Sequence, residues 1–177
     1  MHIIIDGYNL IRQSDSLRRF ERINLEEGRK ALIRSVSFYG KQHRVTIVFD
    51  GWKNGPLEEE RDRQEGIHII YSRKGEKADE VIKRMVGERG GEIVVVTSDR
   101  EIVNFVNRRG GVTIPSREFE SLVNRTNVQM PANIFSLEKE GDENHKTTRG
   151  TKKKGPAKRL SRKERTLLAK VKKLQLP

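Results

Sequence analysis

Short runs of β-branched and other apolar residues alternate along the chain with longer segments in which apolar residues recur every three or four positions. The short runs predict strands, and the periodic segments predict amphipathic helices. Strands are expected at residues 2–5, 44–49, 67–71, 92–97 and 111–114. Because helical segments separate these runs, the pattern indicates βαβ units with a central parallel sheet, and therefore an α/β fold.

Capping patterns and glycine pairs mark the expected ends of the helices. Asn24 and Ser98 each have a glutamate three positions later, which is the capping-box arrangement at a helix N-terminus. One predicted helix starts at Asn24, and a second covers residues 77–89. A third extends from Ser98 to the pair Gly110–Gly111, and a fourth extends from Ser116 to about Asn124.

Basic residues are concentrated towards the C-terminus. From Lys146 onward the chain holds 13 of its 37 lysines and arginines, but only one of its 25 acidic residues, Glu164. This segment therefore carries the whole formal net charge of +12, and residues 1–145 are formally neutral. A polyanion such as RNA is expected to be attracted mainly to this basic tail.

The domain organisation also follows from composition. Residues 1–138 are expected to form one domain. Residues 139–160 have very few aliphatic side chains and are expected to form a flexible basic linker. In residues 161–177 one side of a predicted basic amphipathic helix is apolar, formed by Leu167, Leu168, Val171 and Leu174. That helix would contact RNA, dock on the core, or lie on an acidic membrane surface.

The absence of cysteine and the shortness of the apolar stretches exclude several classes of protein. It has no cysteine, and therefore no disulfide, thiolate zinc site or cysteine nucleophile. Its longest apolar stretches fall far short of the roughly 18 residues that a membrane span needs. The first residues do not form a secretory signal pattern. We therefore expect a cytoplasmic protein without a membrane span.

Carboxylates stand at the ends of three predicted strands. Asp6 and Asp50 directly follow the first two, and Asp99 follows a later one after a single serine. Because the carboxyl ends of parallel strands meet at one edge of the sheet, these side chains are expected to converge. Asp79, in the first turn of a predicted helix, belongs to the same edge, with Glu80 as its neighbour.

Such a cluster of like charges predicts a metal site. Carboxylates raise one another's pKa and resist joint ionisation, and a divalent cation removes this conflict. Mg²⁺ or Mn²⁺ prefers oxygen ligands and leaves room for phosphate oxygens and an activated hydroxide. For each aspartate taken alone, the alternative is a turn or a helix cap formed with its own backbone. For Asp50 the alternative is a simple turn. For Glu80 an equally good alternative is stabilisation of the helix dipole from the first turn.

Five motifs, in order along the chain, resemble the YacP-like NYN-domain proteins. They are Asp6-Gly7-Tyr8-Asn9-Leu10, Val48-Phe49-Asp50, Lys77-Ala78-Asp79-Glu80, Thr97-Ser98-Asp99-Arg100-Glu101 and Ser116-Arg117-Glu118-Phe119. The resemblance covers residues 1 to about 125. It implies a PIN-like three-layer α/β fold and an endoribonuclease that cleaves single-stranded RNA with bound Mg²⁺ or Mn²⁺.

The motif match also suggests roles for individual residues. Asp6, Asp79 and Asp99 would be the core metal ligands, with Asp50 and Glu80 as further candidates. Asn9 would hold the loop that carries Asp6 or contact a phosphate, and its alternative is an Asx turn after the strand.

Ser98 and Thr97 would orient a water or Asp99, although a plain N-cap is the simpler role for Ser98. Because the family includes a ribosome-associated mRNA endonuclease, the resemblance also suggests messenger RNA on ribosomes as the target.

Other interpretations remain beside this one. Trp52 lies at the same edge and either stacks on a base or packs a loop. The mixed charges from Glu58 to Arg63 favour a salt-bridged surface loop. An aspartate-nucleophile phosphatase is disfavoured because no D-x-D motif follows the first strand. The non-enzymatic alternative is an RNA- or ribosome-binding module on a PIN-like scaffold.

Overall fold

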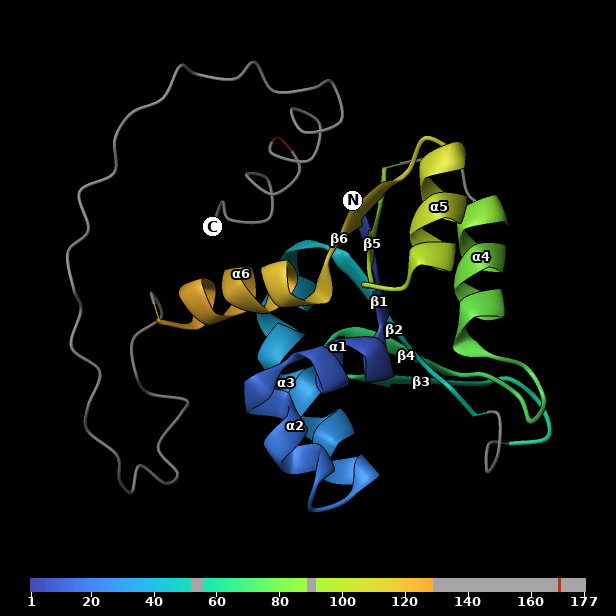
Figure 1. Cartoon of the computed structure of the whole chain (residues 1–177). Coiled ribbons are helices and arrows are strands. Elements are labelled where there is room, and N and C mark those ends of the chain that lie inside the picture. Colours follow the sequence, from blue (N-terminus) through green and yellow to red (C-terminus); the bar gives the residue numbers. More distant parts are fainter. Residues whose placement is uncertain (52–55, 89–91, 129–168, 170–177) are drawn as a thin grey trace, which may run out of the picture.

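The protein is described from a computed structural model, which covers residues 1–51, 56–88, 92–128 and 169. The described residues contain a six-stranded sheet with the strand order β3-β4-β2-β1-β5-β6 (Figure 1). The strands are β1 (His2–Asp6), β2 (Arg44–Phe49), β3 (Glu60–Gln64), β4 (Ile67–Tyr71), β5 (Ile93–Val96) and β6 (Val112–Ile114). All neighbouring strands are parallel except β3 and β4.

Helices cover both faces of the sheet, so the fold has three layers (Figure 1). The core on one face is formed with α1 (Gly7–Gln13), α3 (Leu25–Gln42) and α6 (Ser116–Val128), and α2 (Asp15–Glu21) packs against α1 and α3 and adds Leu17 to this core. The other face packs against α4 (Ala78–Glu88) and α5 (Arg100–Arg108). The predicted α/β class, with its central and mostly parallel sheet, is confirmed.

The alternation of side chains along β1 explains why two separate cores form. Ile3 and Ile5 point into the core beneath α1, α3 and α6, whereas Ile4 points into the core beneath α4 and α5. All three are fully buried. A central strand buried on both faces is uniformly apolar, which is why β1 appears in the sequence as an unbroken run of isoleucines.

Three elements lie where the sequence pattern did not predict them. The helices α1 and α2 occupy the segment between the first strand and Asn24. The antiparallel strand β3 replaces the surface loop expected from the mixed charges, so that prediction was wrong. Its five residues are all exposed. The expected ion pairing is present, because Arg61 Nη2 lies 2.7 Å from Glu59 Oε1.

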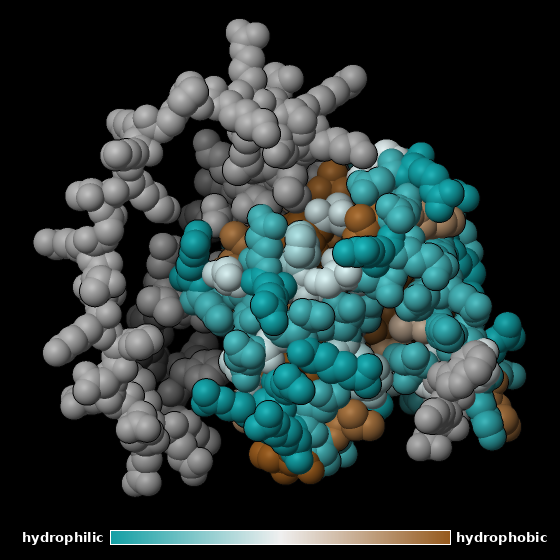
Figure 2. Space-filling view, in the orientation of Figure 1, coloured by the Kyte–Doolittle hydropathy of each residue, from teal (hydrophilic) through white to brown (hydrophobic). Residues whose placement is uncertain are grey.

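Some predictions concern residues outside the described ranges. Trp52 and the predicted linker at residues 139–160 are among them, and of the predicted helix 161–177 only Ala169 is described. Among the described helices, none is long and apolar enough to cross a membrane. The face shown in Figure 2 is mostly hydrophilic, and its apolar patches are small and separate.

Candidate active site

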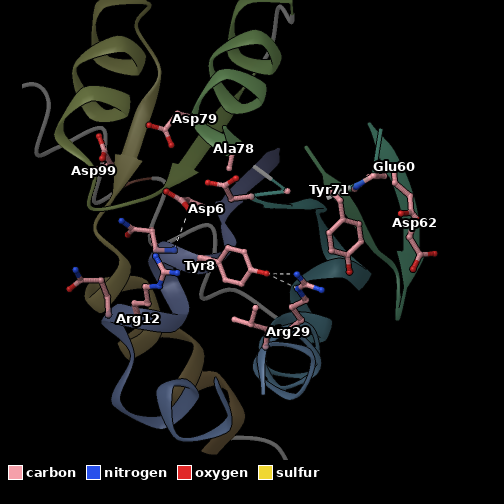
Figure 3. Close-up of a pocket in the computed structure, with 16 residues that line it drawn as sticks. Asp6, Tyr8, Arg12, Arg29, Glu60, Asp62, Tyr71, Ala78, Asp79 and Asp99 are labelled. Carbon is pink, nitrogen blue, oxygen red and sulfur yellow. Dashed lines mark hydrogen bonds between the residues drawn. The ribbon is translucent and has the colours of Figure 1, made fainter. Parts of the chain in front are cut away.

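A cleft of about 1090 Å³ lies at the carboxyl edge of the parallel strands (Figure 3). Its described walls come from both helical layers and from the edge strand β3. Two groups of charged side chains line it: the carboxylates of Asp6, Asp50, Glu60, Asp62, Asp79 and Asp99, and the guanidinium groups of Arg12 and Arg29. The four aspartates that the sequence placed at this edge therefore open onto one cleft.

Asp6 is the most buried of these carboxylates, with 8% of its surface exposed. It ends β1 and caps α1, where its Oδ1 accepts a hydrogen bond from the Asn9 backbone N–H at 3.3 Å. Its Oδ2 accepts one from the Thr97 hydroxyl at 3.0 Å. Burial, with smaller contributions from the charges of Asp79 and Asp99, raises the pKa of Asp6 to about 6 against the effect of these hydrogen bonds.

Thr97 connects Asp6 to Asp99. The Thr97 oxygen that donates to Asp6 also accepts a hydrogen bond from the Asp99 backbone N–H at 3.1 Å. Asp99 caps α5, because its Oδ1 accepts from the backbone N–H groups of Glu101 at 2.7 Å and Ile102 at 3.3 Å. These bonds fix the carboxylate at the helix start and leave Oδ2 without a hydrogen bond from the described residues.

Asp79 lies in the first turn of α4 and is half-buried. Burial and the nearby charge of Asp99 raise its pKa, and Lys83 opposes this shift. Asp50 lies beyond the end of β2, lines the same cleft and is exposed. Glu80 is exposed and is absent from the described walls of the cleft, so the structure does not bring it to the other carboxylates.

Asn9 and Ser98 form a small network that joins three elements. Asn9 is in α1 rather than in an Asx turn, and its Oδ1 accepts from the Ser98 backbone N–H at 2.9 Å and the Ser116 hydroxyl at 2.8 Å. The Ser98 hydroxyl in turn accepts from the Ser116 backbone N–H at 3.1 Å. The expectation that Ser98 caps α5 was wrong, because Asp99 occupies that position.

A second set of bonds positions the segments next to Asp50 and Asp79. The Ser72 hydroxyl accepts from the Gly51 backbone N–H at 2.9 Å and donates to the Glu76 carbonyl at 2.7 Å. Ser72 is fully buried. It therefore ties the segment after β2 to the segment before α4.

The sequence did not single out several residues that line the cleft. Tyr8 follows Asp6 within the quoted motif, but it gave no separate signal. Arg29 on α3 and Tyr71 at the end of β4 come from elements that carried no motif. Only the spatial arrangement brings these three side chains together beside the carboxylates (Figure 3).

The three-layer fold, with aspartates at the carboxyl edge of its sheet, has the architecture of the PIN-like, nuclease-like proteins. Within this class, the family model of the YacP-like NYN domain matches residues 3–173. The chain therefore belongs to the YacP-like NYN-domain family, and the resemblance seen in its motifs is confirmed.

Individual relatives agree with this assignment. The chain is 29% identical over 102 residues to the uncharacterized protein YacP of Bacillus subtilis (strain 168), and the match covers 55% of this chain. It spans 59% of that relative, which is less than two thirds of its length.

Two solved structures are similar in fold. The crystal structure of a point mutant of Rae1 (YacP) from Bacillus subtilis has a TM-score of 0.56 and 25% identity, covering 70% of this chain and 77% of that one. A second crystal structure of Rae1 (YacP), also from Bacillus subtilis, has a TM-score of 0.59 and 24% identity, covering 73% and 78%. The second likeness bears on the fold alone.

Proposed function

We propose that this protein is a metal-dependent endoribonuclease that hydrolyses phosphodiester bonds in single-stranded RNA. One observation supports this most strongly: Asp6, Asp79 and Asp99 come from three separate elements and line one cleft. Their mutual repulsion contributes to the raised pKa of Asp6. Carboxylates gathered at this energetic cost are typical of a site whose function needs them together.

The donor set suits a hard divalent cation, Mg²⁺ or Mn²⁺, because all of its ligands are carboxylate oxygens. Asp6, Asp79 and Asp99 would hold the ion, and Asp50 would contribute from the rim of the cleft. When bound, the ion would neutralise charge on the phosphate and activate a water molecule for in-line attack. Asp79 accepts no hydrogen bond from the described residues, and this leaves its carboxylate able to turn towards an ion.

The chain's own residues hold the carboxylates in place before any ligand arrives. The Asn9 backbone and Thr97 fix both oxygens of Asp6, and the first turn of α5 fixes Asp99. Such supporting bonds reduce the reorganisation that binding requires. Asn9 and Ser98 are therefore proposed as positioning residues, since they join the segments that carry Asp6 and Asp99.

The substrate follows from charge and from the family. The 13 basic residues from Lys146 onward would neutralise RNA phosphates without sequence preference. Messenger RNA on ribosomes is the particular target that we propose from the family resemblance. In this division of roles the tail attracts RNA and the cleft cuts it.

The proposal is tested by incubating the full chain with labelled single-stranded RNA and Mn²⁺ or Mg²⁺, with and without EDTA. The double variant Asp6→Asn, Asp99→Asn is compared with the wild type and with Glu58→Gln, which removes an exposed carboxylate outside the cleft. Cleavage is expected for the wild type and Glu58→Gln, and only with the ion. Cleavage that persists in the double variant or in EDTA would exclude the carboxylate–metal mechanism.

A second readout tests metal binding without catalysis. A ligand that binds only the folded state at 100 times its Kd stabilises that state by about 2.7 kcal/mol. Mn²⁺ should therefore raise the melting temperature of the wild type and of Glu58→Gln, but not that of the double variant. Equal shifts in all three proteins would place the ion elsewhere.

One observation favours a second candidate, an RNA- or ribosome-binding module that does not cut. Within the described part of the chain, no group of three or more His, Cys, Asp or Glu side chains is arranged to hold a metal ion. The same assay separates the two functions. RNA that is bound but never cleaved with any divalent ion would favour the binding module.

A further inference from the structure

The cleft has a second functional group beside the carboxylates. Arg29, on α3, lies among three aromatic rings, with its Cζ 5.5 Å from the ring centroids of Tyr8 and Phe49 and 5.1 Å from that of Tyr71. Its Nε donates a hydrogen bond to the Tyr8 hydroxyl at 2.9 Å, and Nη2 donates to the same oxygen. Figure 3 shows this group opposite Asp79 and Asp99, with Tyr8 beside Asp6.

The rings around Arg29 support one another. The ring centroids of Tyr8 and Phe49 are 5.2 Å apart, and those of Phe49 and Tyr71 are 5.6 Å apart in a stacked arrangement. Phe49 is fully buried and belongs to the core. The guanidinium group is thus held by cation–π contacts and a hydrogen bond, and little side-chain entropy remains to be lost when it binds a ligand.

Arg29 has no direct ion-pair partner among the described residues. Arg84, in contrast, pairs with both Glu76 and Glu59. The Tyr8 hydroxyl occupies Nε and one N–H of Nη2, which leaves Nη1 and the other N–H of Nη2 for a ligand. A fixed guanidinium with these free donors matches the oxygens of a phosphate group.

The charge of the surrounding cleft makes this cation important. Six carboxylates and two arginines line the described walls, so an incoming polyanion meets a net negative surface unless cations bind it. The second arginine, Arg12, lies with its Cζ 5.5 Å from the Tyr8 centroid, on the other side of that ring from Arg29 (Figure 3). Arg12 Nε lies 3.5 Å from Glu21 Oε1. The charge of Arg29 is therefore less compensated than that of Arg12.

We propose that Arg29, oriented by the Tyr8 hydroxyl, binds a backbone phosphate of single-stranded RNA next to the phosphodiester at the carboxylates. The proposal rests on the proposed function for the identity of the polyanion, but not on cleavage. Arg29 would fix the register of the strand across the cleft. The carboxylates would then act on a neighbouring phosphodiester.

Binding is measured on the full chain in EDTA, with a fluorescent hexauridylate and fluorescence anisotropy at several salt concentrations. Arg29→Ala should weaken binding about tenfold, because a charge-assisted contact to phosphate is lost. The slope of log K against log salt should fall by about 0.7, the value for one contact to a single strand. Arg29→Lys retains the charge but loses the planar fork, so its affinity should lie between those of Arg29→Ala and the wild type.

Two further variants make the result specific. Arg22→Ala removes an exposed arginine outside the described walls of the cleft and should leave the affinity and the slope unchanged. Tyr8→Phe removes the hydroxyl that orients Arg29. This substitution should weaken RNA binding when it is introduced into the wild type, but not when it is added to the Arg29→Ala variant. Melting temperatures of all variants show whether each is folded at the temperature of the assay.

The outcomes separate this proposal from the nuclease proposal. If RNA is cleaved with a divalent ion but Arg29→Ala and Arg29→Lys bind like the wild type, Arg29 has a structural role only and the phosphate subsite is wrong. If no RNA is cleaved but the affinity and slope change as stated, the subsite stands and the nuclease proposal fails. An equal effect of Arg22→Ala would also overturn the subsite, since any surface cation would then serve.

Discussion

At the scale of single residues, the capping role and the proposed metal role of an aspartate are compatible. The sequence posed them as alternatives for Asp6 and Asp99, and both side chains do cap helices. Capping fixes where each carboxylate lies, and in Asp99 it occupies only one of the two oxygens. A cap at the carboxyl edge of a parallel sheet thus holds a carboxylate beside the cleft.

The buried Asp6 predicts an unusual dependence of stability on pH. Its pKa is raised from 3.8 to about 6, so between these values the folded protein retains a proton that the unfolded chain releases. Stability should therefore fall as the pH rises from about 4 to 6, and the loss should be complete above this window. In EDTA at pH 7.5, Asp6→Asn should increase the free energy of unfolding by up to about 3 kcal/mol.

Urea unfolding at pH 4 and pH 7.5 measures this effect. The gain should be present at pH 7.5 and nearly absent at pH 4, where Asp6 of the wild type is protonated in the folded state. Glu58→Gln, at an exposed position, should show no such difference. If Asp6→Asn were destabilising at pH 7.5, the hydrogen bonds to the ionised carboxylate would outweigh its burial.

At the scale of elements, hydrophobic patterning predicted the parallel strands but missed an exposed edge strand and two short helices. The five parallel strands have apolar runs, and all were predicted within one or two residues. The strand β3 has no apolar side chain and is held by backbone pairing with β4, so its sequence carries no strand signal. The helices α1 and α2 are seven residues each, too short for a clear periodic stripe.

The residues of the candidate site were also predictable only in part. Its aspartates were predictable because strand ends share an edge of the sheet, a rule that needs only topology. Arg29 was not, because its contacts join α3 to residues of β2, β4 and α1 that are remote in sequence. Ser98 was assigned wrongly because a capping pattern shifted by one residue, with Asp99 as the cap, looks almost the same in sequence.

Asn9 is expected to connect elements rather than to perform chemistry. Asn9→Ala would leave the Ser98 N–H and the buried Ser116 hydroxyl without their acceptor. Loss of such partners costs about 1–3 kcal/mol of stability. We expect that decrease in urea unfolding, together with a lower kcat and a nearly unchanged affinity for RNA.

The control is Asn104→Ala, at an exposed position on α5 that is absent from the described walls of the cleft. Its stability and kcat should match the wild type. A loss of RNA affinity in Asn9→Ala with kcat preserved would instead show that Asn9 contacts the substrate.

Gly7 allows α1 to start directly against β2. A Cβ at this position would lie 2.5 Å from Cε1 of the buried Phe49 and 3.0 Å from Cγ2 of Ile47. Gly7→Ala should therefore destabilise the fold by about 1–3 kcal/mol, as overpacked cores do. Because Phe49 also supports Arg29, the affinity for hexauridylate should fall as well.

Gly87→Ala is the matched control, since Gly87 also lies in a helix. Its added Cβ would meet the flexible Arg109 side chain at 3.3 Å. Thermal unfolding should show it to be as stable as the wild type, or more stable by up to about 1 kcal/mol through helix propensity. Equal destabilisation by both substitutions would contradict the close contact between Gly7 and Phe49.

At the scale of the whole molecule, attraction and chemistry are assigned to different parts of the chain. Residues 1–145 are formally neutral, and the cleft within them is lined by more carboxylates than cations. For the RNA substrate that we propose, long-range attraction would therefore come chiefly from the segment that begins at Lys146, which carries the whole net charge. In the proposed function the cleft would act at short range, through Arg29 and through a bound divalent ion.

Removal of residues 146–177 should accordingly weaken RNA binding and flatten its salt dependence, since each lost phosphate contact lowers the slope of log K against log salt by about 0.7 for a single strand. The Mn²⁺-induced rise in melting temperature should remain, because the carboxylates are retained. Changing Lys152, Lys153 and Lys154 to Gln should produce a partial loss of slope and provides a graded comparison. Unchanged affinity and slope after truncation would mean that the cleft binds RNA unaided, and the neutral domain would then need contacts beyond Arg12 and Arg29.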